Sequence, residues 1–341
     1  MDSFSDLTQR LRTQICYAHI FGDALTEEQL VARCAPADPE GLRRELELLE
    51  ASESVEREGE YWFLSGGVVA GFASSKQVRE RAAQRVLEDQ RMLIGFLKRL
   101  RIVRMLAVSG SVGWKNHVDH VGKPADLDLF VIAAPSGVHI VRLILRVRES
   151  LRWLLSRMGW GRRRASVCPN YLTEIGFLEI TNQSFYTASD ALNVQVLKGE
   201  DIYRRFLVAN RWIERYYPVA LTTRSEAPLD EGRSTARSAL NIVCFATMAA
   251  YAWTKARLAG RPFTYSLGFR FDRTNSLRRS AVAGGGYQPT VARRFHEIYE
   301  RHFGPDSTLH AFLFPGTTDT GVYANGEYAE PTLSTHLGYD E

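Results

Sequence analysis

Hydrophobic residues recur every three or four positions in the first 66 residues and predict three short helices. The first helix is expected over residues 6–21, the second begins at a capping box formed by Thr26 and Gln29, and the third follows Pro39. Two short apolar runs then flank a turn at Glu58-Gly59 and predict a β-hairpin. Three helices followed by a hairpin are typical of a winged-helix domain, which we expect over residues 1–66.

The pattern changes at Gly66-Gly67, where a second region, residues 67–187, begins. One long helix is expected over about residues 76–100 and another over residues 138–158. Short apolar, β-rich runs separate the helices and predict strands at residues 104–109, 126–133 and 166–174. Because strands alternate with helices, we expect an α/β sheet as the core of this region.

Residues 188–305 show mainly helical periodicity and predict a C-terminal all-α domain. Residues 306–341 are rich in Gly, Thr, Pro and Tyr and are expected to form an irregular tail. The longest apolar stretch, residues 240–253, is too short to span a bilayer and contains Asn241. It therefore predicts a buried helix and no transmembrane segment. The expected fold is α/β plus all-α, with a minimal α/β core between a winged helix and a helical domain.

The length of 341 residues fits two or three domains, and 45% hydrophobic and 24% charged residues are ordinary for a globular protein. The N-terminus lacks the basic-then-apolar pattern of a secretory signal. The four cysteines are far apart and form no CxxC pair, so neither a zinc site nor a disulfide framework is expected. These features predict a cytoplasmic protein. The net charge of +4 does not by itself indicate nucleic-acid binding.

Two aspartates alternate with apolar residues at the start of the strand expected at residues 126–133. Side chains alternate along a strand, so Asp126 and Asp128 project from one face, roughly 7 Å apart. Two neighbouring carboxylates in apolar surroundings repel each other and lose hydration. A divalent cation relieves both costs, and oxygen ligands of this kind suit Mg²⁺ or Mn²⁺. The alternative is a strand end at which both aspartates are solvated.

The strand expected at residues 104–109 runs directly into Gly110 and Ser111. Glycine lets a backbone approach a phosphate closely, and the turn amides and the Ser111 hydroxyl can donate hydrogen bonds to phosphate oxygens. This half of the pattern can hold a triphosphate, and Asp126-Leu127-Asp128 can hold the metal that neutralises it. The sequence therefore predicts one combined nucleotide and metal site.

Gly110-Ser111, Asp126-Leu127-Asp128 and the apolar continuation Phe130-Val131-Ile132 resemble the nucleotidyltransferase superfamily, which includes DNA polymerase β, poly(A) polymerases and aminoglycoside nucleotidyltransferases. The spacing between the two halves is slightly longer than usual, and an insertion at residues 117–123 accounts for it. The resemblance implies the superfamily fold and a metal-dependent transfer of a nucleoside monophosphate from a nucleoside triphosphate, with release of pyrophosphate. It leaves the acceptor open among small molecules, proteins and RNA.

The resemblance also implies a third carboxylate on a later strand, where it often activates the acceptor hydroxyl. On the strand expected at residues 166–174, Glu174 is the first candidate, and Glu179, just beyond the strand, is the second. Each of them can equally be an ordinary surface glutamate. If neither acts, the metal can activate the acceptor, or the site can bind a nucleotide without turning it over.

Other residues near the motifs have two interpretations each. Lys115 and Lys123 can meet phosphates as point charges or lie solvated in a loop. Trp114 can stack on a base or anchor its loop in the core. A run of arginines can bind a polyanion or an anionic membrane, or can cover the back of the sheet with long side chains. These arginines are Arg142, Arg146, Arg148, Arg152, Arg157 and residues 162–164.

The third predicted helix carries mainly acidic residues on its exposed side, which repels phosphates. We therefore favour protein docking or a structural role over DNA binding for the winged helix. The leading hypothesis for the whole chain is a nucleotidyltransferase. Its main rival is a regulator or adaptor whose winged helix binds DNA or a partner and whose core only senses nucleotide. A toxin that modifies tRNA or protein is a third hypothesis.

Overall fold

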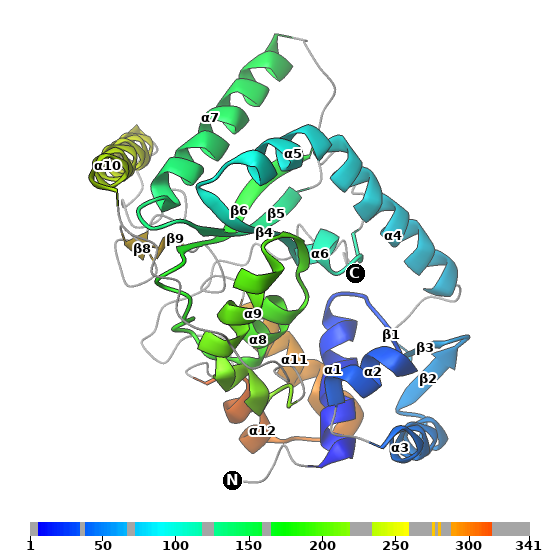
Figure 1. The fold of residues 1–341 in the computed structure, drawn as a ribbon. Coiled ribbons are helices and arrows are strands. Elements are labelled where there is room, and N and C mark those ends of the chain that lie inside the picture. The colour runs from blue at the N-terminus through cyan, green and yellow to red at the C-terminus, as the bar shows by residue number, and fades with distance from the viewer. Residues whose placement is uncertain are drawn as a thin grey trace.

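The computed structural model shows a mixed α/β protein with two small sheets (Figure 1). None of the helices in the described part of the chain is both long and apolar enough to cross a bilayer. The residues described are 6–34, 38–66, 72–117, 126–158, 165–218, 234–258, 275–276, 279–280 and 288–315.

The N-terminal unit, which comprises the described residues between 6 and 66, combines three helices with a three-stranded antiparallel sheet. The Asp6 side chain caps the first helix, and Thr26 and Gln29 bond each other's backbone amides in the predicted capping box. The predicted helices and hairpin of this region are confirmed. The elements are α1 (Leu7–Ile20), β1 (Leu25–Thr26), α2 (Glu27–Cys34), α3 (Pro39–Ala51), β2 (Val55–Glu58) and β3 (Tyr61–Leu64).

A six-stranded sheet in the order β7-β4-β5-β6-β9-β8 forms the centre of the molecule. Strands β4 and β5 are antiparallel. Strands β5 and β6 run parallel, because helix α7 (Val138–Arg157) connects them by a crossover. The three strands predicted for this region are confirmed. The sheet consists of β4 (Val103–Ser109), β5 (Asp126–Ala133), β6 (Ser166–Glu174), β7 (Gln195–Lys198), β8 (Asn275–Ser276) and β9 (Arg279–Ser280).

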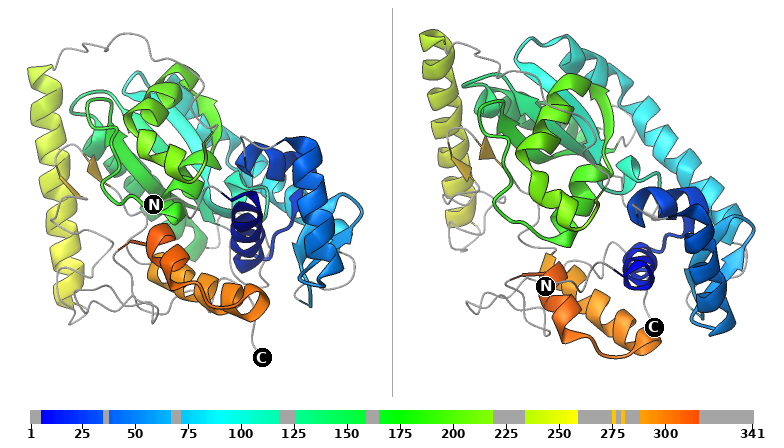
Figure 2. Two further views of the ribbon diagram at one scale, coloured as in Figure 1. Left: turned by 90° about the horizontal axis from the view of Figure 1, so that it is seen from below. Right: turned by 60° about the horizontal axis from the view of Figure 1, so that its bottom comes forward.

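Helices cover both faces of this sheet, and strand residues alternate between the two cores. Leu127, Leu129 and Val131 point to one face, where α4 (Phe72–Asp89), α5 (Arg91–Arg99) and α7 pack on them. Phe130 and Ile132 point to the other face and share a core with α1 and with the helices drawn in green and orange in Figure 2. Those helices are α8 (Phe185–Leu192), α9 (Glu200–Ala209), η1 (Arg211–Arg215) and α11 (Gln288–Phe303). By alternation, Asp126 and Asp128 belong to this second face.

The single helix expected over residues 76–100 is broken at Gln90 into α4 and α5, so this prediction is wrong in part. The Gln90 side chain is buried and donates a 2.8 Å hydrogen bond to the carbonyl of Ala165. It also accepts a hydrogen bond from Arg148 on α7. The residues that stabilise the break therefore lie far away in the sequence, and the helical periodicity around Gln90 could not predict it.

Two predictions for the C-terminal half are also corrected. The region expected to be all-helical contributes β7, which pairs antiparallel with β4 at the edge of the central sheet. The tail expected to be irregular begins with α12 (Ser307–Leu313), which starts where the Asp306 side chain accepts from the Leu309 amide. Residues 316–341 lie outside the described part of the chain.

The apolar stretch at residues 240–253 forms a helix, α10 (Thr235–Leu258), but the prediction that it is buried is wrong. Among the side chains of α10 that the structure describes, those of Asn241, Cys244 and Met248 are buried, on the side that packs against α7. Leu240 and Val243 are 51% and 60% exposed. Helix α10 lies at one flank of the molecule (Figure 2). The described core therefore does not account for the apolar character of this helix.

Candidate functional site

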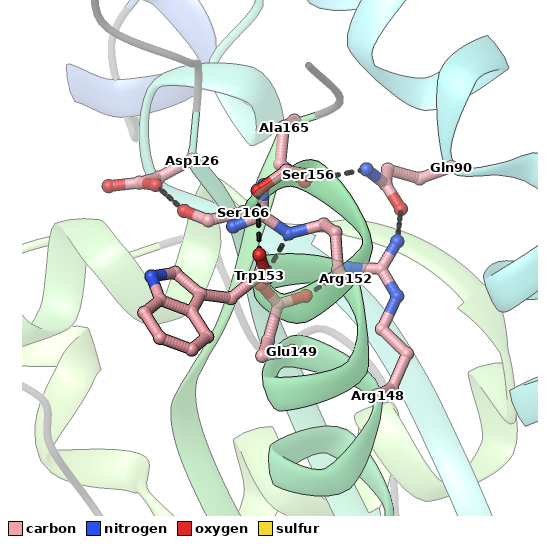
Figure 3. A network of polar contacts seen from close by, with 9 residues as sticks. All are labelled: Gln90, Asp126, Arg148, Glu149, Arg152, Trp153, Ser156, Ala165 and Ser166. Carbon is pink, nitrogen blue, oxygen red and sulfur yellow. Dashed lines mark hydrogen bonds and ion pairs between the residues drawn. The ribbon is translucent and has the colours of Figure 1, made fainter. Parts of the chain in front are cut away.

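Asp126 and Asp128 lie at the start of β5, next to the point where β4 ends. The Asp126 side chain is exposed, and that of Asp128 is half-buried. The hydroxyl of Ser166, on the neighbouring strand β6, donates to the Asp126 carboxylate (Figure 3). The strand thus presents both carboxylates on the sheet face that α8 covers.

Gly110 brings the Gly-Ser turn into contact with Asp128. Its φ of +62° lies in the left-handed region, and a Cβ at this position would stand 2.2 Å from Oδ2 of Asp128. In the sheet, Ser109 is the register partner of Asp128. Only glycine permits both this backbone conformation and this close approach. The structure therefore brings together the two halves of the motif that the sequence predicts as one site.

Ser111 lies in α6 (Gly110–Gly113), the short helix that begins at this glycine and leads into a loop. Its side chain is exposed, and its hydroxyl lies 3.1 Å from Nδ1 of His117. Its carbonyl accepts a 2.8 Å hydrogen bond from the Asn116 amide, which closes the loop. Lys115 is exposed in the same loop, with a φ of +54°. Lys123 lies in residues 118–125, outside the described part of the chain.

Trp114 in this loop packs against the N-terminal unit. Its ring centroid is 5.4 Å from that of Phe21 and 5.8 Å from that of Tyr17, and the Arg33 guanidinium lies 5.7 Å from its ring. Two residues later, the Asn116 side chain donates a 2.8 Å hydrogen bond to the Phe21 carbonyl. Of the two interpretations of Trp114, these contacts favour the anchor.

A third carboxylate that the sequence did not indicate, Asp190 on α8, acts electrostatically on Asp128. Burial, together with the charges of Asp190 and Asp126, raises the pKa of Asp128 to about 7. Burial also raises the pKa of Asp190 to about 6. No spacing or motif marks Asp190, because only the tertiary packing of α8 on the sheet brings it near Asp128 at the start of β5.

Glu174, the expected third carboxylate, lies at the opposite end of the strands. Its register partner is Ala133, the last residue of β5, roughly 15 Å along the strand from Asp128. Its buried side chain accepts a 2.7 Å hydrogen bond from the Ser136 amide and so holds the turn before α7. This placement overturns the catalytic prediction for Glu174. The second candidate, Glu179, lies in the exposed segment after β6, also beyond that end of the strand.

The β6 residues beside the aspartate pair are not acidic. Ser166 and Cys168 are the register partners of Asp126 and Asp128. Burial and the charges of the two aspartates raise the pKa of the Cys168 thiol to about 12, so the thiol stays protonated at neutral pH. Among the described residues, no group of three or more His, Cys, Asp or Glu side chains is arranged to hold a metal ion. A cation at this site would need further oxygen ligands from its substrate.

The arginines of α7 have mostly internal partners. Arg142 is buried, and burial lowers its pKa to about 10. Arg148 and Arg152 both pair with Glu149 (Figure 3). Arg146 donates a 2.6 Å hydrogen bond to the Tyr251 hydroxyl on α10. For these four arginines the contacts support the structural interpretation, whereas residues 162–164 fall outside the description.

No protein-family model, no curated protein and no solved structure matches this chain.

Proposed function

We propose that the described residues between 72 and 198 form a nucleotidyltransferase fold and that the N-terminal unit is a winged helix. In the core, the antiparallel β4–β5 pair is followed by the parallel β5–β6 pair, with the Gly-Ser turn after β4 and the aspartates on β5. The N-terminal unit runs helix, strand, two helices and hairpin, and β1 joins the hairpin at its edge. Both arrangements support the resemblance carried by the motifs.

The activity we propose is the metal-dependent transfer of a nucleoside monophosphate from a nucleoside triphosphate to an acceptor, with release of pyrophosphate. The contact between Gly110 and Asp128 carries this proposal. It sets a turn that can hold phosphates directly against carboxylates that can hold a cation. Either half alone has an ordinary structural explanation, so the proposal rests on the contact between them.

The residues present fit Mg²⁺ or Mn²⁺. Asp126 and Asp128 share one face, and the raised pKa of Asp128 indicates that the chain itself does not compensate its negative charge. Mg²⁺ is usually held by one or two protein carboxylates, with substrate phosphates and water completing its shell. The two-carboxylate site therefore suffices. When bound, the cation would neutralise the charge that develops on the transferred phosphoryl group.

The chain's own groups would hold the triphosphate and move one proton. The amides of the Gly110-Ser111 turn and the Ser111 hydroxyl would donate to phosphate oxygens. Asp190, whose pKa of about 6 lies near neutrality, would accept the proton of the acceptor hydroxyl. As the acceptor oxygen bonds to the α-phosphorus, the bond from that phosphorus to the pyrophosphate oxygen breaks. The acceptor stays open among a small molecule, a protein and an RNA.

The test is a labelling experiment with each of the four α-labelled nucleoside triphosphates, Mg²⁺ or Mn²⁺, and a cell extract as the source of acceptor. We expect the wild-type protein to transfer label to one extract component, and Asp126→Asn and Asp128→Asn to abolish the transfer. Asp201→Asn, a change at an exposed aspartate of α9, is the matched control and should label like wild type. Equal labelling by all four proteins would refute the activity.

One observation favours a second function, a regulator or adaptor whose core binds nucleotide without turning it over. The resemblance implies a third carboxylate on a later strand, but the β6 residues beside the aspartates are Ser166 and Cys168. Nucleotide binding without pyrophosphate release would support this alternative. DNA reading by α3 is not favoured, because Glu40, Glu47 and Glu50 are exposed on it.

A further inference from the structure

Most of the large apolar side chains that the described structure leaves exposed lie on two adjacent helices. Helix α7 with its C-cap residue and helix α10 hold twelve of the seventeen. The two helices contact each other through Leu143, Phe245 and Met248, so their exposed residues flank one contact. These twelve residues, here named the α7/α10 surface, are Val147, Leu151, Trp153, Leu154, Leu155, Met158, Leu240, Ile242, Val243, Tyr251, Trp253 and Leu258.

Helix α10 indicates that this surface is covered by something other than water. A helix that is apolar on nearly all sides is normally buried. Here the buried side chains, among those of α10 that the structure describes, face α7, while Trp253 is 51% and Leu258 is 84% exposed. Scattered exposed apolar residues need no explanation, but twelve of them gathered on two helices that contact each other mark a site of interaction.

The charges around the α7/α10 surface are positive. Helix α10 contains no Asp or Glu, and Glu149, the acidic residue of α7, is already paired within its own helix. Arg157 lies 4.6 Å from the Trp153 ring centroid, and Arg257 lies 5.4 Å from that of Trp253. Each helix thus carries an exposed cation beside an exposed indole ring near its C-terminus.

We propose that the α7/α10 surface docks the protein on the face of an anionic lipid bilayer. Aliphatic side chains gain by entering the boundary between headgroups and acyl chains, tryptophan favours that boundary, and arginine binds lipid phosphates. Nucleic acid would satisfy the arginines but offers no apolar surface for leucine and valine side chains. A second copy of the chain would bring two cationic surfaces together with no free acidic group described on either helix.

The test is co-sedimentation of the full chain with phosphatidylcholine vesicles and with vesicles that also contain phosphatidylglycerol. We expect binding to the anionic vesicles only. The pair of changes Trp153→Ala and Trp253→Ala should weaken it about tenfold or more. Each of Arg157→Glu and Arg257→Glu should weaken it about fivefold. Met92→Ala removes a side chain that is 74% exposed on α5 and is the matched control, which should bind like wild type.

Several outcomes would overturn the proposal. They are no vesicle binding, equal binding to neutral vesicles, and equal loss in the Met92→Ala control. Light scattering that shows a dimer, dissociated by the two tryptophan changes, would identify a second copy as the occupant. RNA retention that the same changes abolish would identify a polyanion instead. All substituted side chains are exposed, and circular dichroism would verify that each variant keeps its fold.

Discussion

At Gly110, the backbone and a neighbouring side chain each require the same residue. The left-handed φ of +62° favours glycine, and the Asp128 carboxylate occupies the space in which a Cβ would lie. Gly95 in α5 is the opposite case, because no atom stands within 4 Å of its Cβ position. Glycine is therefore required at position 110 by the backbone conformation and the contact with Asp128, whereas at position 95 the helix only tolerates it.

We expect Gly110→Ala to lower the free energy of unfolding by about 2 kcal/mol or more, from backbone strain and the displacement of Asp128. Nucleoside triphosphate binding should weaken with it. Gly95→Ala should instead raise stability by about 0.5–1 kcal/mol, because alanine favours a helix interior. Denaturant unfolding and a binding titration measure both effects. Similar results for the two variants would contradict the close approach of Asp128 to the turn.

Asp190 is the second residue that is important for the proposed activity. We expect Asp190→Asn to lower the rate of nucleotidyl transfer by about 10²–10⁴-fold, because the proton acceptor is lost. The dissociation constant of the triphosphate should change much less, since Asp190 is not expected to hold phosphates. Rates and dissociation constants measured side by side test this, and Asp190→Glu should recover part of the rate. An unchanged rate in Asp190→Asn would remove Asp190 from the mechanism.

At the scale of elements, the local sequence pattern was enough to predict a helix or strand wherever the residues of that element specify it. The capping box at Thr26 and Gln29 marks the start of α2, and Asp126 and Asp128 alternate with the leucines of β5. The break at Gln90 depends on partners in α7 and at Ala165, which local periodicity does not contain. Strand β7 has only four residues between two helices, and its pairing with β4 identifies it.

The same distinction applies to the candidate site. Gly110-Ser111 and the aspartate pair are marked by residue type and spacing, so the sequence predicts them as one site, and in the structure Gly110 contacts Asp128. Asp190 is marked by nothing local, since it is one acidic residue on a short helix. Glu174 has the residue type and the facing expected of a third carboxylate, but the parallel register with β5 carries it to the far end of the strand. Strand register and tertiary contacts therefore determine which further carboxylate lies near the aspartate pair.

The contact between α1 and α11 should make stability depend on pH. Burial, followed by the charges of His302 and Arg301, lowers the pKa of His19. Burial and Arg301 also lower the pKa of His302. Both histidines are therefore neutral in the folded protein at a pH where the unfolded chain binds protons. The stability they contribute is present above the unfolded pKa of 6.5 and is lost as the pH falls below it.

Thermal unfolding at pH 7 and pH 5 tests this expectation. The wild-type melting temperature should fall between the two values, and the fall should be smaller for His19→Gln combined with His302→Gln. An equal fall in the double variant and the wild type would show that the two histidines do not link this contact to pH.

In the molecule as a whole, the candidate site lies where three parts of the chain meet. The loop after Gly110 is fixed to the N-terminal unit through Trp114 and Phe21. Arg33 of that unit donates a 3.0 Å hydrogen bond to Asn193, the C-cap residue of α8. A hydrophobic core that extends from α1 to α11 joins these parts. A ligand that bridges the turn and the aspartates should therefore stabilise the molecule as one body.

The proposed nucleotide and metal site consists of Gly110-Ser111 and the Asp126–Asp128 pair. Its most direct test is calorimetric titration of the full chain with the four nucleoside triphosphates, each carrying a methylene group between the α- and β-phosphorus, with and without Mn²⁺. We predict that at least one analogue binds, about tenfold or more tightly with Mn²⁺, and that Asp126→Asn combined with Asp128→Asn removes this gain. Absence of binding, or binding that neither Mn²⁺ nor the two changes affect, would contradict the claim.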